Sequence, residues 1–422
     1  MRIRFGFSLG FAIFAGLGLS AFGLLASAWY LKVIGVILGL AVLLPGLLVV
    51  SWLFQAKYQP LIEPENAGSG MQMETWTVAD DGQHNAFTDL LFWHEQYWLV
   101  YVSSPSHFAS NKSRLVLSRS SDAHHWQEVR KFDGAGQDIR DPKFGIVHDQ
   151  LFLYALLNQS FDPEPYKTIV THSQNGLDWT PFEDVMPDGW LLGRPATVNG
   201  STWFAPAHRT DEGSAVLLRS TDGLNWVIHS AIFKGKVERA DETALLFSKG
   251  ADMLAVTRLE EGSSIFGSDH AVTLISTASP PYTTWIETAR SSATRLDGPI
   301  LFSAHDQIYA VGRRQPCPGA RSGIRDRFRK MIDKKKQGSV FSQKRTALFQ
   351  VGKNGSGLTF LSDLPSSGDT SYAGVVVQDE KAFISYYTND PDKDYPWILG
   401  MLLPTRIQIS MFNFTRLLPE EK

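Results

Sequence analysis

A short motif that ends in tryptophan recurs along this chain and constrains its fold more than any other feature. The motif reads S-x-D-x-x-x-W at Ser120–Trp126 and S-x-D-G-x-x-W at Ser220–Trp226, and Asn replaces the Asp at Ser173–Trp179. A stretched copy without the acid spans Ser276–Trp285. The tryptophans lie roughly 50 residues apart, a period typical of repeated supersecondary units. We therefore expect a series of similar structural repeats.

Each motif has the chemistry of a tight turn between strands. An Asp or Asn side chain accepts hydrogen bonds from the turn amides, Gly takes a positive φ angle, and Trp packs beneath the turn. We therefore interpret the motifs as structural staples rather than as parts of an active site. They resemble the Asp boxes, or BNR repeats, of sialidases and related β-propellers.

Composition narrows the function classes. The chain has 422 residues, 35 of them glycine, and 12% of its residues are aromatic, which suits many short strands joined by turns. A net charge of −3 excludes a global nucleic-acid-binding surface. Cys317 is the single cysteine, so the sequence contains no disulfide framework and no CxxC spacing. Since nucleotide-binding and metalloprotease motifs are also missing, we expect neither a cofactor nor a bound metal.

The N-terminus is long and apolar. Residues 5–54 contain one charge, Lys32, and exceed the roughly 20 residues of a single membrane span. We predict a transmembrane hairpin over residues 1–57, with helices at about 5–28 and 33–54, and a linker over 58–73. The alternative is a signal peptide cleaved after Ala26–Ala28. It is disfavoured because its apolar stretch exceeds the usual 7–15 or so residues and a second membrane-length segment follows.

The positive charges predict the orientation of this hairpin. Arg2 and Arg4 outweigh Lys32, so the N-terminus is expected in the cytoplasm, and a hairpin returns the chain to that side. We therefore predict a multi-pass protein of the inner (plasma) membrane with a cytoplasmic main domain. A periplasmic or extracellular domain is the alternative.

A second feature points to a membrane. Residues 321–336 contain eight Lys or Arg and two Asp, and their apolar residues fall on one helical face. A basic amphipathic helix of this kind is typical of segments that lie on anionic lipid. The alternative interpretation is a solvated charged insertion between strands.

The remaining chain predicts an all-β fold, a six-bladed sialidase-like β-propeller over residues 74–415 with the basic segment as an insertion at 318–345. Six polar segments each precede an apolar run and mark the start of a blade. They are His84–Asp89, Ile139–Lys143, Leu192–Pro195, Asp241–Ala244, Leu296–Pro299 and Ser371–Gly374. Residues 74–78 are expected to complete the last blade beside residues 406–410. Five blades with an extra sheet are the alternative.

The candidate site follows from this topology. The innermost strand of each blade begins at one end of the channel, so the polar residues at these starts should converge there. Buried charges are costly unless they are paired or used, which makes this mouth a candidate binding or catalytic site. The residues are His84, Asn85, Asp89, Arg140, Asp141, Lys143, Arg194, Glu242, Asp297 and Tyr372. His208, by contrast, is interpreted as a surface or structural residue.

The resemblance to sialidases implies roles for these residues. Those enzymes use a Tyr nucleophile activated by Glu, an Asp acid/base and three Arg that bind a sugar carboxylate. The order Glu242, Arg258, Arg313, Tyr372 over consecutive blades is the order of the sialidase site. By this resemblance Tyr372 is the nucleophile, Glu242 its partner, and Asp89 or Asp141 the acid. The chain departs from the family in blade one, where His84–Phe87 stand in place of an Arg-containing motif; Arg140 or Arg194 would then supply the third guanidinium.

The sequence is also similar to bacterial sialidase-like propellers of the exo-alpha-sialidase type, whose substrate is unproven. The similarity covers residues 75–390 and is carried by five segments: His84–Leu90, Arg140–Lys143, Glu242–Leu245, Pro280–Trp285 and Gly368–Gly374.

We therefore expect a membrane-anchored, sialidase-like glycoside hydrolase that acts on an acidic sugar of a glycan or glycolipid. A neutral phenol suits such a substrate, because a carboxylate nucleophile would be repelled by the sugar carboxylate. The expected substrate-binding residues are Arg140, Arg194, Arg258, Arg313, His84, Asn85 and Asp297. A non-catalytic propeller that binds a glycan or lipid-linked sugar at the membrane is the first alternative, and a protein-interaction scaffold is the second.

Overall fold

The computed structural model describes residues 15–21, 24, 28–53, 73–158, 166–209, 211–248, 250–262, 267–268, 271–291, 294–316 and 338–413. The chain divides into an N-terminal unit, residues 1–58 with 393–395, and a second unit that holds the rest. The predicted basic helix, residues 321–336, lies outside the described residues, as does almost all of the predicted linker.

The N-terminal unit contains one long apolar helix, α2 (Trp29–Leu53), with Pro45 inside it. Its first 19 residues form the one stretch of the described chain that is long and apolar enough to cross a membrane. The break predicted between the two helices, at residues 29–32, is wrong, because these residues already belong to α2. The first predicted span, residues 5–28, is described only in part, and residues 15–21 of it are helical. One apolar helix is therefore present, and a hairpin with two membrane spans stays a prediction.

Small residues let the helical segment 15–21 pack closely against α2. A Cβ atom added to Gly16 would lie 2.8 Å from the backbone nitrogen of Leu43, and one added to Gly39 would lie 2.7 Å from the carbonyl oxygen of Gly16. The hydroxyl of Ser20 donates a hydrogen bond to that same carbonyl, at 2.9 Å. Larger side chains at these two glycines would push the helices apart.

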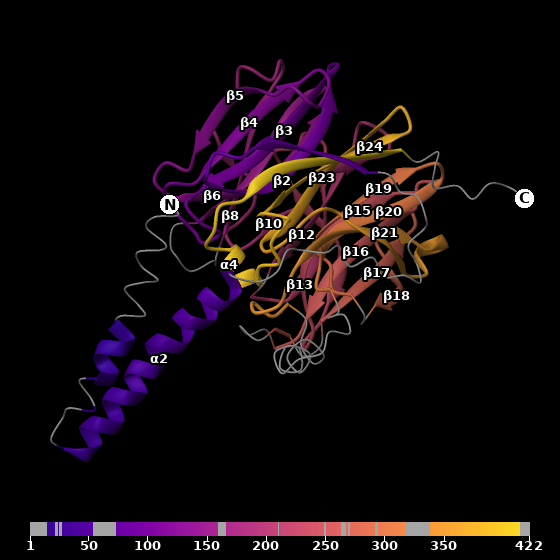
Figure 1. Ribbon diagram of the computed structural model, residues 1–422. Coiled ribbons are helices and arrows are strands. Elements are labelled where there is room, and N and C mark those ends of the chain that lie inside the picture. Colours follow the sequence, from indigo (N-terminus) through magenta and orange to yellow (C-terminus); the bar gives the residue numbers. More distant parts are fainter. Residues whose placement is uncertain are drawn as a thin grey trace, which may run out of the picture. The chain divides into compact units, whose positions relative to one another are not determined.

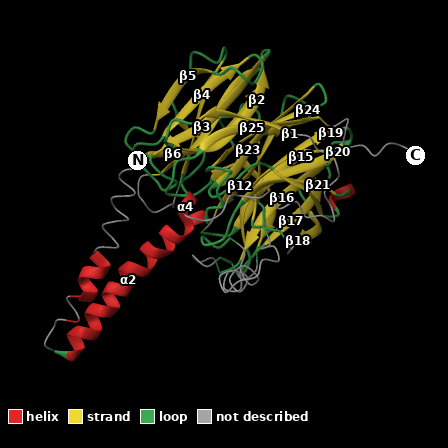
Figure 2. Cartoon of the chain, in the orientation of Figure 1, coloured by secondary structure: helices red, strands yellow, loops and turns green. Residues whose placement is uncertain are grey.

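The second unit is built from six antiparallel sheets, and strands far outnumber helices in it (Figures 1 and 2). Blade one holds β2 (His84–Trp93), β3 (Gln96–Ser104), β4 (Arg114–Ser120) and β5 (Gln127–Asp133). Blade two holds β6 (Asp138–Val147), β7 (Gln150–Asn158), β8 (Lys167–Ser173) and β9 (Glu183–Asp184). Blade three holds β10 (Leu191–Leu192), β11 (Ala196–Thr197), β12 (Trp203–Arg209), β13 (Ser214–Ser220) and β14 (Val227–Lys234).

Blade four holds β15 (Arg239–Phe247), β16 (Met253–Glu260), β17 (Val272–Ala278) and β18 (Ile286–Ser291). Blade five holds β19 (Asp297–Ala304), β20 (Gln307–Arg314), β21 (Arg345–Val351), the short 3-10 helix η1 (Lys353–Gly355) and β22 (Leu358–Asp363). Blade six holds β23 (Thr370–Gln378), β24 (Lys381–Thr388) and β25 (Arg406–Asn413), with the short helix α4 (Trp397–Gly400) between the last two. The prediction of a six-bladed all-β propeller is confirmed.

The last blade is closed by the strand that precedes the first. β1 (Met73–Ala79) pairs antiparallel with β25, and Thr75 stands opposite Ser410. The two hydroxyls of this pair are 2.7 Å apart. β1 and β25 lie side by side although they come from opposite ends of the propeller sequence, as Figure 2 shows. The predicted closure of the ring by residues 74–78 is therefore confirmed.

The apolar cores lie between neighbouring blades. Val147 and Phe152 of blade two are buried against Trp203 and Trp226 of blade three, and similar clusters join blades three and four, four and five, and five and six. A further cluster joins blade one to blades two and six. Because the strands bury both faces in this way, their sequences read as nearly continuous apolar runs rather than as strict alternation.

The tryptophan motifs form the turns between the third and fourth strands of blades one to three. In the motif of blade three, Asp222 Oδ1 accepts hydrogen bonds from the amides of Leu224 and Asn225 at 2.9 and 2.8 Å. Trp226 donates its ring N–H to the carbonyl of Gly223 at 2.9 Å. Gly223 has φ of 75°, the positive angle that the motif requires. The predicted turn chemistry is confirmed in detail.

The degenerate copy in blade four has a different geometry. Trp285 donates its ring N–H to the hydroxyl of Ser230 on β14, in the preceding blade, at 3.1 Å. Tyr282 is buried against Phe204 of that blade, with ring centroids 5.2 Å apart. The tryptophan of this copy thus bonds to the preceding blade instead of to a carbonyl of its own turn.

Replacing Asp222 by Ala should destabilise the propeller. Burial alone would raise the pKa of this carboxyl, but the backbone and side-chain N–H groups of Asn225 lower it to about 2, so the carboxylate is the form that the turn binds. Because Asp222 is partly exposed, we expect a loss of about 1 kcal/mol in the free energy of unfolding, measured by urea denaturation.

The matched control is Asp184→Ala, which removes an exposed carboxylate paired with Lys167. Exposed ion pairs contribute roughly 0–1 kcal/mol, so this variant should unfold close to the wild type. Equal effects of the two substitutions would contradict a specific turn-closing role for Asp222.

Candidate active site

Five inner strands carry the same irregularity near their starts. The strand register shifts within β2, β6, β15, β19 and β23. Phe87, Asp141, Gly298 and Tyr372 adopt positive φ angles at these points, between 48° and 56°. A β-bulge redirects a side chain out of its normal alternation and is common beside active sites. Residues at the predicted blade starts are thereby turned toward the channel mouth.

A cavity of about 770 Å³, including its open mouth, lies at this end of the propeller. Its polar and ionisable lining residues are Asp89, Asp141, Lys143, Arg194, His208, Thr243, Glu242 and Tyr372, and its apolar lining includes Leu192, Pro206, Ile300 and Leu301. The cavity therefore combines a few polar groups from several blades with an apolar wall.

Tyr372 and Glu242 meet in this cavity from blades six and four. The phenol of Tyr372 donates a hydrogen bond to Glu242 Oε1. Glu242 Oε2 accepts from Arg258 Nη1 at 2.7 Å and from the amide of Gly298 at 3.2 Å. Burial and the negative charge of Glu242 hold the pKa of Tyr372 well above its usual value, so the phenol is neutral. Any use of Tyr372 as a nucleophile therefore needs a base, and Glu242 is in contact with it.

A network of buried ion pairs adjoins this Tyr–Glu pair. Asp297 accepts from Arg295 at 2.6 and 3.0 Å and from Arg313 at 3.1 Å, and Arg258 Nε lies 3.3 Å from it. Burial alone would raise the pKa of Asp297, but these guanidinium groups lower it far below its usual value. The charges of Arg258 and Arg313 are thus already balanced by protein carboxylates, and neither residue lines the cavity.

The two candidate acids have different surroundings. Asp89 is 1% exposed and accepts hydrogen bonds from Arg194 Nε at 3.2 Å, from Arg194 Nη2, and from the amides of Phe144 and Leu90 at 2.7 and 3.0 Å. Asp141 is 22% exposed and contacts Lys143 Nζ at 2.6 Å. A guanidinium and two amides thus hold Asp89 in place, whereas Asp141 is partly exposed where it lines the cavity.

The other predicted site residues lie outside the cavity lining. Arg140 is paired with Asp138 and donates to the carbonyl of His107 at 3.2 Å. His84 and Asn85 are fully buried, and Asn85 donates to Asp81 at 2.8 Å. Of the predicted residues, the cavity brings together Tyr372, Glu242, Asp89, Asp141, Lys143 and Arg194, and it does not include Arg140, Arg258, Arg313, His84, Asn85 or Asp297.

Two residues of the site were missed. His208 lines the cavity from β12, and its Nε2 lies 3.1 Å from Asp241 Oδ1, while Arg258 Nη2 lies 3.3 Å from Asp241 Oδ2. Asp241 immediately precedes Glu242 in its blade start, which was a usable signal. His208 is on a second strand, well away from any blade start, so the reasoning from inner strands could not find it.

No protein-family model matches the sequence, and neither does any curated protein. Among solved structures, the fold is similar to a protein of unknown function from Dyadobacter fermentans DSM 18053, with TM-score 0.60 and 15% identity over 82% of this chain and 99% of that one. It is also similar to Trypanosoma rangeli sialidase, with TM-score 0.56 and 11% identity over 82% of this chain and 60% of that one. A third similar structure is Penicillium chrysogenum alpha-L-arabinanase, with TM-score 0.53 and 14% identity over 81% of this chain and 99% of that one. At these identities the similarity shows the propeller fold, which sialidases and an arabinanase share.

The His208–Asp241 contact should make stability depend on pH. Burial alone would lower the pKa of His208, but the hydrogen bond to Asp241 and its charge raise the pKa above 6.5. A raised pKa in the folded state stabilises the protein fully below the unfolded value and loses that effect as pH rises through the folded value. The free energy of unfolding of wild type minus that of His208→Gln should therefore be largest near pH 6 and shrink by about pH 8. A difference that stays constant with pH would contradict a protonated His208.

Proposed function

We propose that the protein is a glycoside hydrolase in which Tyr372 attacks the anomeric carbon of a sugar. The observation that carries this proposal is the hydrogen bond from the Tyr372 phenol to Glu242 inside the cavity. A neutral, buried phenol hydrogen-bonded to a carboxylate is the arrangement that lets the carboxylate remove the phenol proton as the new bond forms. The hydrogen bond from Arg258 to the second oxygen of Glu242 holds the carboxylate in position for this role.

The reaction would proceed in two steps. In the first, the Tyr372 oxygen bonds to the anomeric carbon, its proton passes to Glu242, and the glycosidic oxygen leaves with a proton from Asp141. In the second, Asp141 removes a proton from water, the water oxygen replaces the tyrosine oxygen, and Glu242 returns the proton to the phenolate. Two displacements at the same carbon retain its configuration.

Asp141 is proposed as the acid in preference to Asp89. Both oxygens of Asp89 already accept hydrogen bonds from Arg194 or from backbone amides, whereas the side chain of Asp141 is 22% exposed and lines the cavity. Asp89 would instead hold Arg194 at the cavity wall.

The substrate proposed is an acidic sugar, bound through Arg194 and Lys143. These are the two cationic side chains among the described residues that line the cavity, together with His208 when it is protonated. Arg suits a carboxylate because its planar fork can bond both oxygens. The fold shared with sialidases supports a glycoside substrate.

A second candidate function is glycan binding without turnover. The engagement of Arg258 and Arg313 by Asp297 favours it, because these guanidiniums are not free to grip a substrate anion. In that case Glu242 and Tyr372 would serve as hydrogen-bonding partners of the glycan rather than as reacting groups.

We also propose that the N-terminal unit anchors the propeller to the inner (plasma) membrane with a cytoplasmic main domain. The apolar stretch Trp29–Leu47 is long enough for one span, and the segment 15–21 that packs against α2 would belong to the second. Contact of residues 321–336 with anionic lipid belongs to the same proposal.

The purified full-length chain should release the aglycone from fluorogenic sialosides or uronides. Glu242→Gln and Asp141→Asn should each lower kcat by roughly 10²–10⁴-fold, because each removes one proton transfer. Tyr372→Phe lacks the nucleophile and should form no covalent intermediate. Tyr97→Phe, a buried tyrosine of blade one, is the matched control and should keep wild-type turnover.

Turnover by Tyr372→Phe equal to that of the wild type would contradict the proposed nucleophile. Saturable binding of an acidic glycan by the wild type, measured by calorimetry with no product released, would instead support the binding function. In that case Arg194→Gln should weaken binding.

Membrane topology can be tested with reporters fused after Lys422. A fluorescent protein that matures in the cytoplasm should be active there, and a phosphatase that requires the periplasm should be inactive. The matched control is a fusion truncated after Ala28, which a two-span hairpin places on the opposite side. Activity of the phosphatase at the C-terminus would contradict the hairpin and indicate a single span or a secreted domain.

A further inference from the structure

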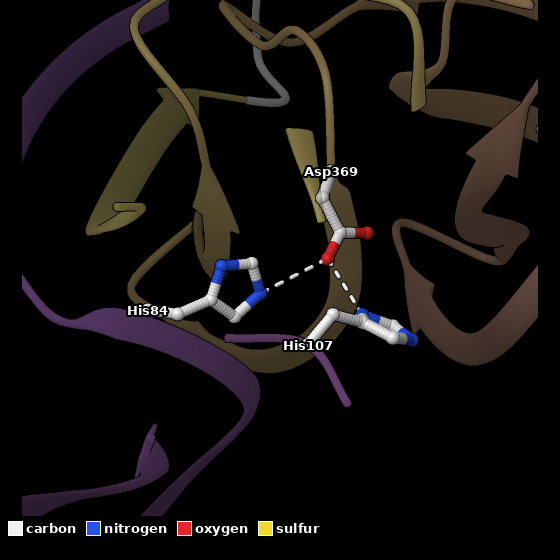
Figure 3. A group of neighbouring side chains, drawn as sticks. All are labelled: His84, His107 and Asp369. Carbon is white, nitrogen blue, oxygen red and sulfur yellow. Dashed lines mark hydrogen bonds and ion pairs between the residues drawn. The ribbon is translucent and has the colours of Figure 1, made fainter. Parts of the chain in front are cut away.

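Three side chains outside the cavity converge on one point at the junction of blades one and six. His84 begins β2, His107 follows β3, and Asp369 directly precedes β23. Asp369 Oδ2 lies 3.1 Å from His84 Nε2 and 2.6 Å from His107 Nδ1. Figure 3 shows both imidazole rings directed at this one carboxylate oxygen. The three atoms all lie within 4.8 Å of one another.

Neighbouring groups hold each of these side chains in place. The second ring nitrogen of His84, Nδ1, lies 2.8 Å from the carbonyl oxygen of Leu403 and must donate to it, which aims Nε2 at Asp369. The other oxygen of Asp369 accepts from Trp397 Nε1 at 2.7 Å and from Tyr387 Oη at 3.1 Å. Metal-binding histidines and carboxylates are typically oriented by such outer hydrogen bonds.

We propose that His84, His107 and Asp369 bind one divalent transition-metal ion, with Zn²⁺ as the best match. Two imidazole nitrogens and one carboxylate oxygen form a common zinc ligand set that leaves a fourth position for water. Tetrahedral zinc with ligands at roughly 2.0–2.1 Å separates its ligand atoms by about 3.3 Å. The observed separations of 3.1 and 2.6 Å need small outward movements to reach that value.

Access and charge are compatible with this ion. His84 and Asp369 are fully buried, but the side chain of His107 is 19% exposed, so one ligand reaches solvent. Two guanidiniums are close: Arg140 donates to the carbonyl of His107 at 3.2 Å and is paired with Asp138, and Arg313 approaches the far oxygen of Asp369 at 3.4 Å and is itself paired with Asp297 at 3.1 Å. Their charges are thus largely balanced before the metal binds.

The ion would link blades one and six where the ring closes. Thr405, which precedes β25 of blade six, forms a parallel bridge with His84 and donates its amide to Gln83 at 3.1 Å, so the ligands span the junction of the first and last blades. The free energy of metal binding would then add to the stability of the closed ring. Asp369 lies shortly before Ser371 and Tyr372, whose φ angles are 96° and 48°, so the same ion would hold the start of β23. This role does not depend on the proposed glycosidase activity.

The test uses the full-length chain in detergent, stripped with a chelator and then titrated with Zn²⁺. Calorimetry and metal analysis after desalting should find one tightly bound zinc per chain, and the melting temperature should rise on loading. His107→Gln should lose this zinc and the rise in melting temperature. His94→Gln, which removes an exposed His–Asp pair between blades one and two, is the matched control and should retain both.

Zinc binding that is no stronger in the wild type than in His107→Gln would overturn the proposal, and so would a melting temperature that zinc leaves unchanged. If His107→Gln does not fold, X-ray absorption of the zinc-loaded wild type decides the question. A first shell with two imidazole nitrogens supports the site, and a shell of water and carboxylate oxygens overturns it.

Discussion

The pairing of β1 with β25 is the interaction on which the rest of the structure depends. The apolar cores of the described residues lie between neighbouring blades, and the part of the blade-one cluster that includes blade six exists only when the ring is closed. Closure also brings Tyr372 of blade six and Glu242 of blade four to one cavity, although they are far apart in sequence. Most strands of a sheet are close together in the sequence, whereas the candidate site needs residues from several blades of the closed ring.

The centre of the ring holds a dense set of opposite charges. Arg258 contacts Asp241, Glu242, Glu260 and Asp297, which leaves it no free side on which to bind a ligand anion. Removing one partner from such a network strands a buried charge, at a cost of roughly 3–5 kcal/mol. The network therefore fixes the position of Glu242 and, through it, the position of Tyr372. Arg258 and Arg313 therefore support the site, whereas Arg194 lines the cavity.

Sequence reasoning was strong where a pattern is local and weak where partners are distant. The turn motif, the six blade starts and the closing strand all have short-range signatures, and each appears in the structure. The roles of Arg258, Arg313 and His84 could not be predicted, because a buried ion pair and a ligand-binding group look alike in one sequence. Asp369 was missed although it stands three residues before Tyr372, since its partners come from blade one and α4. The start of α2 was misplaced because Lys32 is accommodated within the helix.

The most direct test of Tyr372 as the nucleophile is to trap its covalent intermediate. The protein is incubated with a fluorinated, activated acidic glycoside, which slows the second step, and its peptides are then analysed by mass spectrometry. A sugar attached to the Tyr372 oxygen, in the peptide that contains β23, is the predicted result. A sugar attached to Glu242 or Asp141 instead, or rapid turnover with inversion at the anomeric carbon, would contradict it.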